Sequence, residues 1–264
     1  MTVPDTSAAA KRIGVFDSGV GGLSVLREIH RHLPNIPTIY YADQAHLPYG
    51  MRTPEEVRHL VDLAADFLIA QGARILVIAC HTASAASLHN LRARHPTIPI
   101  VGMEPAVKPA AERTQTGVIG VLTTRVTAQS ELYRRVVERF AHDVRVITQA
   151  APELVTMVEQ GTQDTPEGEA ILRRYLAPLV EAYADHLVLA CTHFPFLMPK
   201  LKSMTEMTLI DPGAAVARQV MRVLPADVLP ADADHLYYTT GMPEQFQHAL
   251  VRLLGITARV LAVS

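Results

Sequence analysis

The length and composition of the chain are those of an ordinary globular protein. Its 264 residues can bury one large core or two small ones, and 49% of them are hydrophobic against 19% charged. The net charge of −2, without any cluster of Lys or Arg, argues against nucleic acid or an anionic membrane surface as the main partner. Residues 1–12 do not resemble a signal peptide, and no apolar run reaches the roughly 18 residues that cross a bilayer. We therefore expect a cytoplasmic protein.

Strand-like and helix-like segments alternate along the first half of the chain. Apolar runs at 13–16, 38–41 and 75–79 predict three short buried strands. Thr53 is typical of an N-cap, with Pro54 in the first helical position and Glu56 completing a capping box, so a helix is expected to begin there. This alternation predicts an α/β fold with a mainly parallel sheet.

The same order of elements returns 106 to 112 residues later. The runs at 119–122, 144–147 and 187–190 repeat the three strands, and Thr165-Pro166 opens another helix. This repeat predicts two similar, mainly parallel-sheet α/β domains related by a pseudo-twofold axis, with the active site in the cleft between them. Because more helix and strand follow Asp211, the first domain is expected to be discontinuous, spanning 1–98 and 208–264, with the second domain at 99–207.

Both cysteines of the chain stand directly after a repeated strand. Cys80 is followed by His81-Thr82, and Cys191 by Thr192-His193. Sites in parallel sheets form at the carboxyl ends of strands, so a pseudo-twofold axis would bring the two thiols face to face. One thiolate could then remove a proton from a stereocentre while the opposite thiol supplies one. The arrangement predicts racemisation or epimerisation.

Neighbouring groups are expected to tune these thiols and to bind a substrate. The start of a helix near Ala83 and the imidazole of His193 would each lower the pKa of the adjacent thiol. Asp17 could hold a substrate ammonium group, act as a proton partner of one thiol, or merely cap the helix that follows it. The hydroxyls that could bind carboxylate oxygens are those of Thr82, Thr124, Thr127 and Thr192.

The glycines after Asp17 do not indicate a nucleotide site. Gly19, Gly21 and Gly22 match neither the GxGxxG pattern nor a P-loop, which ends in Lys-Ser/Thr. A tight turn between a strand and a helix explains them without phosphate.

Several motifs taken together resemble the bacterial glutamate racemases, a branch of the aspartate/glutamate racemase superfamily, from Ile13 to about Gln219. The resemblance is carried by Phe16-Asp17-Ser18-Gly19-Val20-Gly21-Gly22-Leu23-Ser24-Val25, by Tyr41-Ala42-Asp43 with Pro48-Tyr49-Gly50, by Cys80-His81-Thr82-Ala83-Ser84-Ala85, by Val101-Gly102 with Pro105, by Cys191-Thr192-His193-Phe194-Pro195 and by Ile210-Asp211-Pro212.

This resemblance implies an enzyme without a cofactor or metal that interconverts L- and D-glutamate for peptidoglycan synthesis. It implies that Cys80 deprotonates D-glutamate and Cys191 deprotonates L-glutamate, with Asp17, Glu159 and His193 as auxiliary groups. The positions that match substrate contacts of the family are Asp17, Ser18, Pro48, Tyr49, Gly50, His81, Thr82, Thr124, Thr127 and Thr192.

The chain departs from the usual residues of the family at four positions, one of which is a substrate contact. Ala190 and Phe194 replace glycine and tyrosine beside the second cysteine, and Thr123 stands where glycine is frequent, all of which are expected to affect packing only. His81 replaces an asparagine that contacts substrate in the family. An imidazole can still form hydrogen bonds but titrates near neutral pH. We therefore hypothesise that His81 preserves glutamate binding and adds a pH dependence.

Other interpretations of the same residues remain open from sequence. Cys80, His81, Cys191 and His193 are ligand types suited to zinc, although no CxxC spacing is present. A non-catalytic amino-acid binding protein would also use a two-domain cleft. A pyridoxal-phosphate enzyme is disfavoured because none of the four lysines lies in a recognisable Schiff-base context. Aspartate as substrate, a homodimer, and control by a cell-wall precursor are not decided by the sequence.

Overall fold

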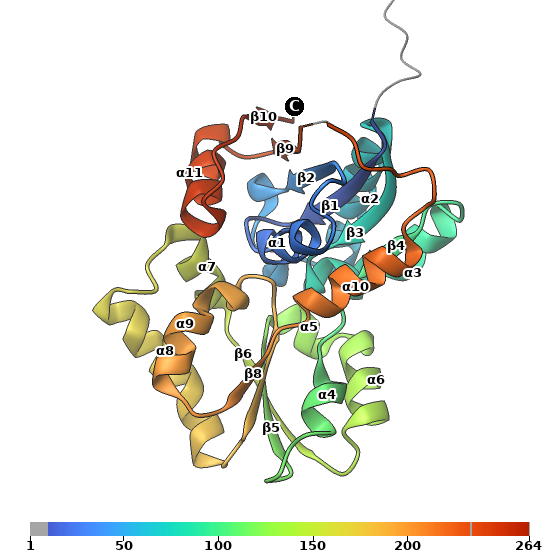
Figure 1. Cartoon of the computed structure of the whole chain (residues 1–264). Helices are drawn as coiled ribbons and strands as arrows, with labels where there is room; N and C mark the ends of the chain where they lie inside the picture. The colour runs from blue at the N-terminus through green and yellow to red at the C-terminus, as the bar shows by residue number, and fades with distance from the viewer. Residues whose placement is uncertain (1–9, 233, 264) are drawn as a thin grey trace, which may run out of the picture.

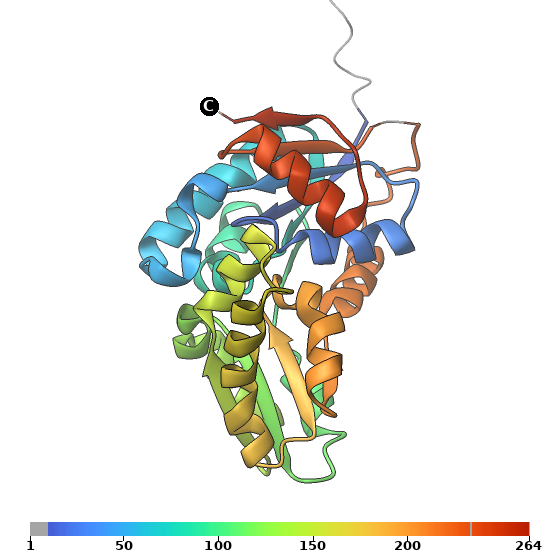
Figure 2. The same ribbon diagram turned by 90° about the vertical axis from the view of Figure 1, so that its left-hand side faces the viewer.

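The protein consists of two α/β halves, each built on its own parallel sheet (Figure 1). The computed structural model describes residues 10–232 and 234–263, so most of the segment 1–12, expected not to be a signal peptide, lies outside the described residues. The helices of both halves cover the faces of the sheets, and the sheets lie one above the other along the long axis of the molecule (Figure 2).

The first sheet has six strands and the second has four, and every pair of neighbours is parallel. The first contains, in spatial order, β10 (Val260–Ala262), β9 (Leu236–Thr239), β2 (Thr38–Ala42), β1 (Arg12–Asp17), β3 (Ala73–Ile78) and β4 (Ile100–Gly102). The second contains β6 (Arg145–Ala150), β5 (Val118–Thr123), β7 (His186–Ala190) and β8 (Thr208–Ile210).

Helices connect the strands in both halves. The first half and the crossover from it contain α1 (Leu23–His32), η2 (Gln44–His46), η3 (Tyr49–Met51), α2 (Pro54–Ala70), α3 (His81–Arg94) and α4 (Val107–Ala111). The second half contains α5 (Arg125–Gln129), α6 (Glu131–Phe140), α7 (Pro152–Gln160), α8 (Pro166–Glu181), η4 (Phe194–Leu197) and α9 (Met198–Met204). The chain ends with α10 (Gly213–Val223) and α11 (Pro243–Leu254).

Local sequence signals explain where the longest helices begin. The Thr53 hydroxyl accepts from the backbone N–H of Glu56, whose carboxylate accepts from the N–H of Thr53, so the expected capping box of α2 is confirmed. Thr165 caps α8 by a single hydrogen bond, in which its hydroxyl accepts from the N–H of Gly168. Strands β3 and β7 are buried because helices cover both faces of each sheet, and only Arg74 near the start of β3 is exposed.

The predicted duplication is confirmed by the strand order. Strands β2-β1-β3-β4 of the first sheet correspond one by one to β6-β5-β7-β8 of the second. The return of the chain to the first half is confirmed as well, because β9 pairs with β2 and β10 with β9.

The expected domain boundaries at 98/99 and 207/208 need correction. Strand β4 follows the first expected boundary yet pairs with β3, and β8 follows the second yet pairs with β7. Each repeat therefore keeps its fourth strand, and the chain crosses between the halves only after that strand. The physical reason is that β4 and β8 satisfy the outer backbone groups of the strands that carry the cysteines.

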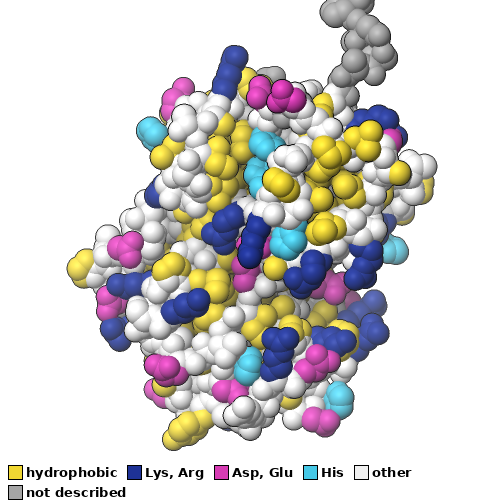
Figure 3. Space-filling model, viewed as in Figure 1, with side chains coloured by type: hydrophobic (Ala, Val, Ile, Leu, Met, Phe, Trp, Pro, Cys, Tyr) yellow, Lys and Arg dark blue, Asp and Glu magenta, His cyan; other side chains and the backbone are white. Residues whose placement is uncertain are grey.

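The surface carries both signs of charge. On the face shown in Figure 3, Lys and Arg side chains are interspersed with Asp and Glu over both halves. Among the residues that the structure describes, none of the helices combines the length and the apolar character needed to cross a membrane.

Candidate active site

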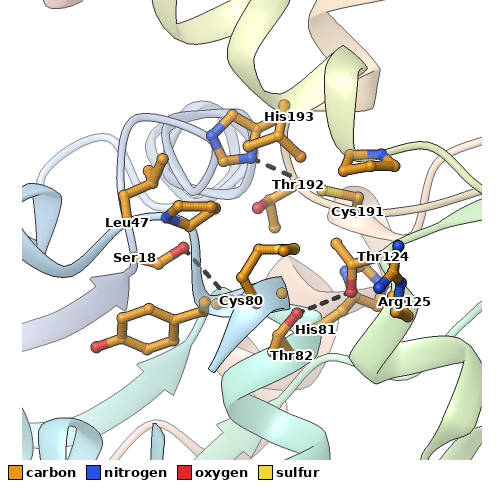
Figure 4. Close-up of a pocket in the computed structure, with 16 residues that line it drawn as sticks. Ser18, Leu47, Cys80, His81, Thr82, Thr124, Arg125, Cys191, Thr192 and His193 are labelled. Carbon is orange, nitrogen blue, oxygen red and sulfur yellow. Dashed lines mark hydrogen bonds between the residues drawn. The ribbon is translucent and has the colours of Figure 1, made fainter. Parts of the chain in front are cut away.

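A pocket lies between the two halves, and both cysteines line it (Figure 4). Cys80 follows β3 of the first half and Cys191 follows β7 of the second, and each is only 6% exposed. The residues lining this pocket are Ser18, Leu47, Pro48, Tyr49, Gly50, Met51, Cys80, His81, Thr82, Thr124, Arg125, Pro152, Val155, Cys191, Thr192 and His193. The two thiols predicted from the repeated strands are thus brought to one pocket from opposite halves.

Cys80 occupies the N-cap of α3, which begins at His81 rather than near Ala83 as expected. Its sulfur accepts from the N–H of Ala83 at 3.5 Å and lies 3.7 Å from the Ser18 hydroxyl. Burial and then the charge of Asp17 raise the pKa of the Cys80 thiol to about 12, against the smaller opposing effect of the N–H and the hydroxyl. The expected lowering by the helix start is therefore outweighed, and Cys80 is a thiol at neutral pH.

Cys191 has a different set of neighbours. Its sulfur lies 3.7 Å from Nδ1 of His193, and Nε2 of the same ring lies 2.7 Å from a carboxylate oxygen of Glu159. That oxygen also accepts from the N–H of Val20 at 2.9 Å. These contacts form a continuous chain from Cys191 through His193 to Glu159. From the sequence, Glu159 was expected as an auxiliary group only through the resemblance to the family.

The electrostatics of this chain favour an ion pair. Burial disfavours the charged imidazole, but the hydrogen bonds with Cys191 and Glu159 raise the pKa of His193 well above its usual range. Burial likewise opposes ionisation of Glu159, yet its hydrogen bond with His193 leaves its pKa lowered overall. An imidazolium beside a sulfur stabilises negative charge on that sulfur, so this half of the pocket is suited to a thiolate.

Asp17 lies behind the pocket wall. It is fully buried at the end of β1, where its carboxylate accepts from the N–H of Gly19 at 2.8 Å and from the Thr192 hydroxyl at 3.0 Å. Burial raises its pKa to about 6, despite the nearby charge of His193 and these two hydrogen bonds. In this position Asp17 acts on Cys80 and Thr192, so the expected direct contact with a substrate ammonium group is not supported.

The glycines after Asp17 permit close contact between the halves. A Cβ atom on Gly19 would lie 2.2 Å from the Glu159 carboxylate, and one on Gly21 would lie 2.4 Å from Nδ1 of His193. A tight turn joins β1 to α1 as expected, but Gly19 and Gly21 do not have positive φ, so the backbone conformation alone does not require glycine at these two positions. They are required because the His193–Glu159 pair packs directly against this backbone.

Three threonine hydroxyls join the halves at the other side of the pocket. The Thr82 hydroxyl lies 3.0 Å from that of Thr124, and Thr124 donates to Thr127 at 3.0 Å. Thr82 and Thr124 line the pocket, while Thr127 lies behind them. These hydroxyls can rotate to donate to a bound carboxylate.

The segment Pro48-Tyr49-Gly50 is brought to the pocket as predicted. The Tyr49 hydroxyl donates to the buried carboxylate of Asp43 at 2.6 Å, which fixes the 3₁₀ turn η3 that carries this segment. Gly50 faces the Thr124 side chain across the pocket rim.

His81 lines the pocket but does not have the pKa that we hypothesised. The ring is 2% exposed, and neither Nδ1 nor Nε2 has a hydrogen-bond partner among the described residues. Burial lowers its pKa to about 3, so His81 is neutral throughout the neutral pH range. A pH dependence near pH 6 to 7 is therefore not expected from this residue.

Sequence reasoning missed five lining residues, namely Leu47, Met51, Arg125, Pro152 and Val155. Of these five, only Arg125 could have been expected from the sequence, because it lies between Thr124 and Thr127, which were already predicted to bind substrate. The others are apolar and belong to segments whose distance from the cysteines is set by the packing of the halves. In residues 10–232 and 234–263, no three His, Cys, Asp or Glu side chains gather in a way that could hold a metal ion.

The fold and this site together define a class of protein: a two-half α/β enzyme with one cysteine from each half at a shared pocket. The chain belongs to the Asp/Glu/Hydantoin racemase family, and residues 13–220 match the sequence model of that family.

Named relatives agree with this assignment. The chain is 49% identical over 253 residues to the glutamate racemase of Pseudomonas syringae pv. tomato, covering 94% of this chain and 92% of that protein. The crystal structure of Escherichia coli glutamate racemase in complex with L-glutamate and the activator UDP-MurNAc-Ala superposes with a TM-score of 0.86 at 31% identity, covering 96% and 97% of the two chains. The Francisella tularensis enzyme in complex with D-glutamate gives 0.84 at 26% identity, covering 97% and 98%.

Proposed function

We propose that this protein is a glutamate racemase that interconverts L- and D-glutamate with Cys80 and Cys191 as the two acid–base groups. The observation that carries the proposal is the approach of both thiols to one pocket from opposite halves. Relatives named glutamate racemase, at up to 49% identity over most of the chain, support glutamate as the substrate. The same resemblance supports a cytoplasmic role in supplying D-glutamate for peptidoglycan.

The neighbours of each thiol give a direction to the proposed chemistry. For L-glutamate, the thiolate of Cys191 takes the α-proton and the thiol of Cys80 delivers its own proton to the opposite face of the same carbon. The product is D-glutamate, with Cys80 left as thiolate and Cys191 as thiol, and the reverse reaction follows the same steps backwards. His193, held by Glu159, stabilises the negative charge on Cys191 before the proton is taken.

Substrate binding in this proposal uses neutral groups from both halves. The hydroxyls of Thr82 and Thr124, which can rotate, and the backbone around Gly50 can donate to carboxylate oxygens. The Thr192 hydroxyl also lines the pocket but already donates to Asp17. Ser18 lies beside Cys80 and can contact the substrate on that side. The neutral ring of His81 offers one donor and one acceptor, as the amide of asparagine does, so it is compatible with glutamate binding.

Racemisation in D₂O tests this proposal. Purified protein is incubated with L-glutamate, D-glutamate or L-aspartate, while circular dichroism follows loss of chirality and mass spectrometry follows the α-hydrogen. The expected result is racemisation of both glutamate isomers with one deuterium gained at the α-carbon. Activity on aspartate but not glutamate would reassign the substrate within the family. Binding of glutamate without any exchange would indicate a binding protein instead.

A further inference from the structure

Arg252 links the last helix of the first half to the helix of the second half that carries Glu159. It lies in the last turn of α11, and its Nη2 donates to the backbone carbonyls of Val158 at 2.8 Å and Glu159 at 2.9 Å. These residues are more than ninety positions apart in sequence. The contact is therefore created only by the packing of α11 against the end of α7, which Figure 1 shows side by side.

The chemistry of a helix end explains why an arginine suits this place. The last carbonyls of a helix have no partner within the helix, and the C-terminus carries partial negative charge. A guanidinium offers several N–H groups in one plane together with a positive charge. Gly161 ends α7 with φ of 71°, and a Cβ atom there would lie only 2.7 Å from Nη1 of Arg252. The guanidinium thus covers the end of α7 closely.

Glu159 is consequently held at both its ends. Its carboxylate accepts from His193 and from the N–H of Val20, while its backbone carbonyl accepts from Arg252. Loss of the backbone contact would allow the last turn of α7 to fray. The carboxylate would then meet His193 less often. The N–H groups of Gly161 and Thr162 hold the carbonyls of Val158 and Met157, but Arg252 makes the one hydrogen bond to the Glu159 carbonyl in the described chain.

We propose that Arg252 is a positioning residue for the Cys191–His193–Glu159 chain. It fixes the end of α7 so that Glu159 pairs with His193, and through that pair it favours negative charge on the sulfur of Cys191. Arg252 does not touch the reacting atoms and is not a catalytic residue. The proposal extends the proposed function, but its central consequence concerns the reactivity of Cys191 in the free protein, whatever the substrate is.

The alternative is that Arg252 only caps a helix. Either role predicts a lower melting temperature when the arginine is removed. Only the positioning role predicts a slower reaction at Cys191 without a slower reaction at Cys80, whose neighbours Ser18, Ala83 and Asp17 do not contact Arg252. Because charge on Cys191 raises the pKa of Cys80, less charge on Cys191 can only speed the reaction of Cys80, so Cys80 serves as the reference rate within the same molecule.

The experiment measures the alkylation rate of each cysteine by iodoacetamide at pH 7, using peptide mass spectrometry on the substrate-free protein. Arg252→Met keeps the apolar stem and removes the donors, and Arg252→Lys keeps a donor and the charge. Glu159→Gln gives the effect of breaking the chain directly. Arg222→Met, an exposed arginine in the last turn of α10, is the matched control. Circular dichroism confirms folding, and Arg252→Gln replaces Arg252→Met if the latter does not fold.

The positioning role predicts that Arg252→Met lowers the ratio of the Cys191 rate to the Cys80 rate by about 3- to 10-fold, the range that one lost hydrogen bond supports. Glu159→Gln lowers the ratio at least as much, Arg252→Lys restores most of it, and Arg222→Met leaves it unchanged. With glutamate, kcat/KM falls equally in both directions because the two enantiomers have equal free energy. An unchanged ratio in Arg252→Met, with or without a change in Glu159→Gln, would overturn the proposal. A wild-type protein that fails to racemise glutamate would overturn only the proposed function.

Discussion

The surroundings of Cys80 and Cys191 differ although the strands that carry them are equivalent. In the first half, the residue at the end of β1 is Asp17, and its charge is the second largest cause of the raised pKa of Cys80. At the equivalent end of β5 stands Thr123, whose hydroxyl donates to the Ala190 carbonyl. Two residues beyond each cysteine the first half has Thr82 and the second has His193. Side chains that differ between the two repeats thus place a carboxylate near the sulfur of Cys80 and an imidazole near the sulfur of Cys191.

A duplicated unit can therefore give its two thiols different electrostatic surroundings. A two-base racemase needs one thiolate and one thiol at any moment, because one group takes a proton while the other gives one. The backbone repeat supplies the positions, and a few unrepeated side chains supply the electrostatic difference. Burial and the charge of Asp17 favour the thiol at Cys80, while His193, paired with Glu159, lies where it can stabilise negative charge on the sulfur of Cys191.

The largest expected effect comes from removing either cysteine. Cys80→Ala and Cys191→Ala should each lower racemisation by about 10²- to 10⁴-fold, since one proton-transfer group is lost. Each variant should retain slow exchange of the α-hydrogen in one isomer only, L-glutamate for Cys80→Ala and D-glutamate for Cys191→Ala. Nuclear magnetic resonance in D₂O measures this exchange.

The comparison of the two thiols predicts faster residual exchange in Cys80→Ala than in Cys191→Ala, because the remaining Cys80 must first lose a strongly held proton. Equal residual rates would mean that the two surroundings do not differ in the way the structure indicates. Cys80→Ala is also expected to retain glutamate affinity, which separates a loss of chemistry from a loss of binding.

A smaller effect is expected from Asp17→Asn, which removes a negative charge near Cys80. Because the charge of Asp17 raises the pKa of Cys80, the variant should show faster alkylation of Cys80 at pH 8. Asp17 itself has a pKa raised from 3.8 to about 6, so the folded state gains stability at low pH and loses it as the pH rises from 4 through 6. The asparagine variant lacks this loss, which amounts to about 3 kcal/mol at most for a shift of this size.

Denaturant unfolding at pH 4 and pH 8 measures the second effect, with Asp211→Asn as the control. Asp211 is also largely buried, has a raised pKa, and accepts from the N–H of Gly213 just as Asp17 accepts from Gly19. It should reproduce the sign of the stability change without affecting Cys80. A Cys80 alkylation rate that is the same in Asp17→Asn as in the wild type would remove Asp17 from the account of that thiol.

The smallest effect is expected from His81→Asn. Since burial lowers the pKa of His81 to about 3, the pH profile of racemisation between pH 6 and 9 should keep its shape, with KM changed by less than about 3-fold. The lowered pKa means that the folded state loses stability as the pH falls from 6.5 towards 3, so the variant should resist acid unfolding better. A profile midpoint near pH 6.5 that vanishes in the variant would show that His81 is charged during turnover.

Much of the fold was predictable because its signals are local. The capping box at Thr53, the apolar strand before each cysteine and the repeated order of three strands were all read from residues close together in sequence, and the structure confirms them. The domain boundaries were wrong because β4 and β8 are three residues long, and pairing with a neighbour, not composition, decides which sheet they join.

What the sequence alone determined is the identity and placement of the two thiols, because a duplicated pattern of apolar strands is a local property of the chain. The electrostatic surroundings of those thiols, in contrast, depend on the tertiary structure. Burial, the approach of Glu159 to His193, the charge of Asp17 behind Cys80 and the unpaired ring of His81 all depend on contacts between segments far apart in sequence. Electrostatic energies in a buried site depend on such distances and on the exclusion of water, and neither can be derived from the amino-acid sequence before the fold is known.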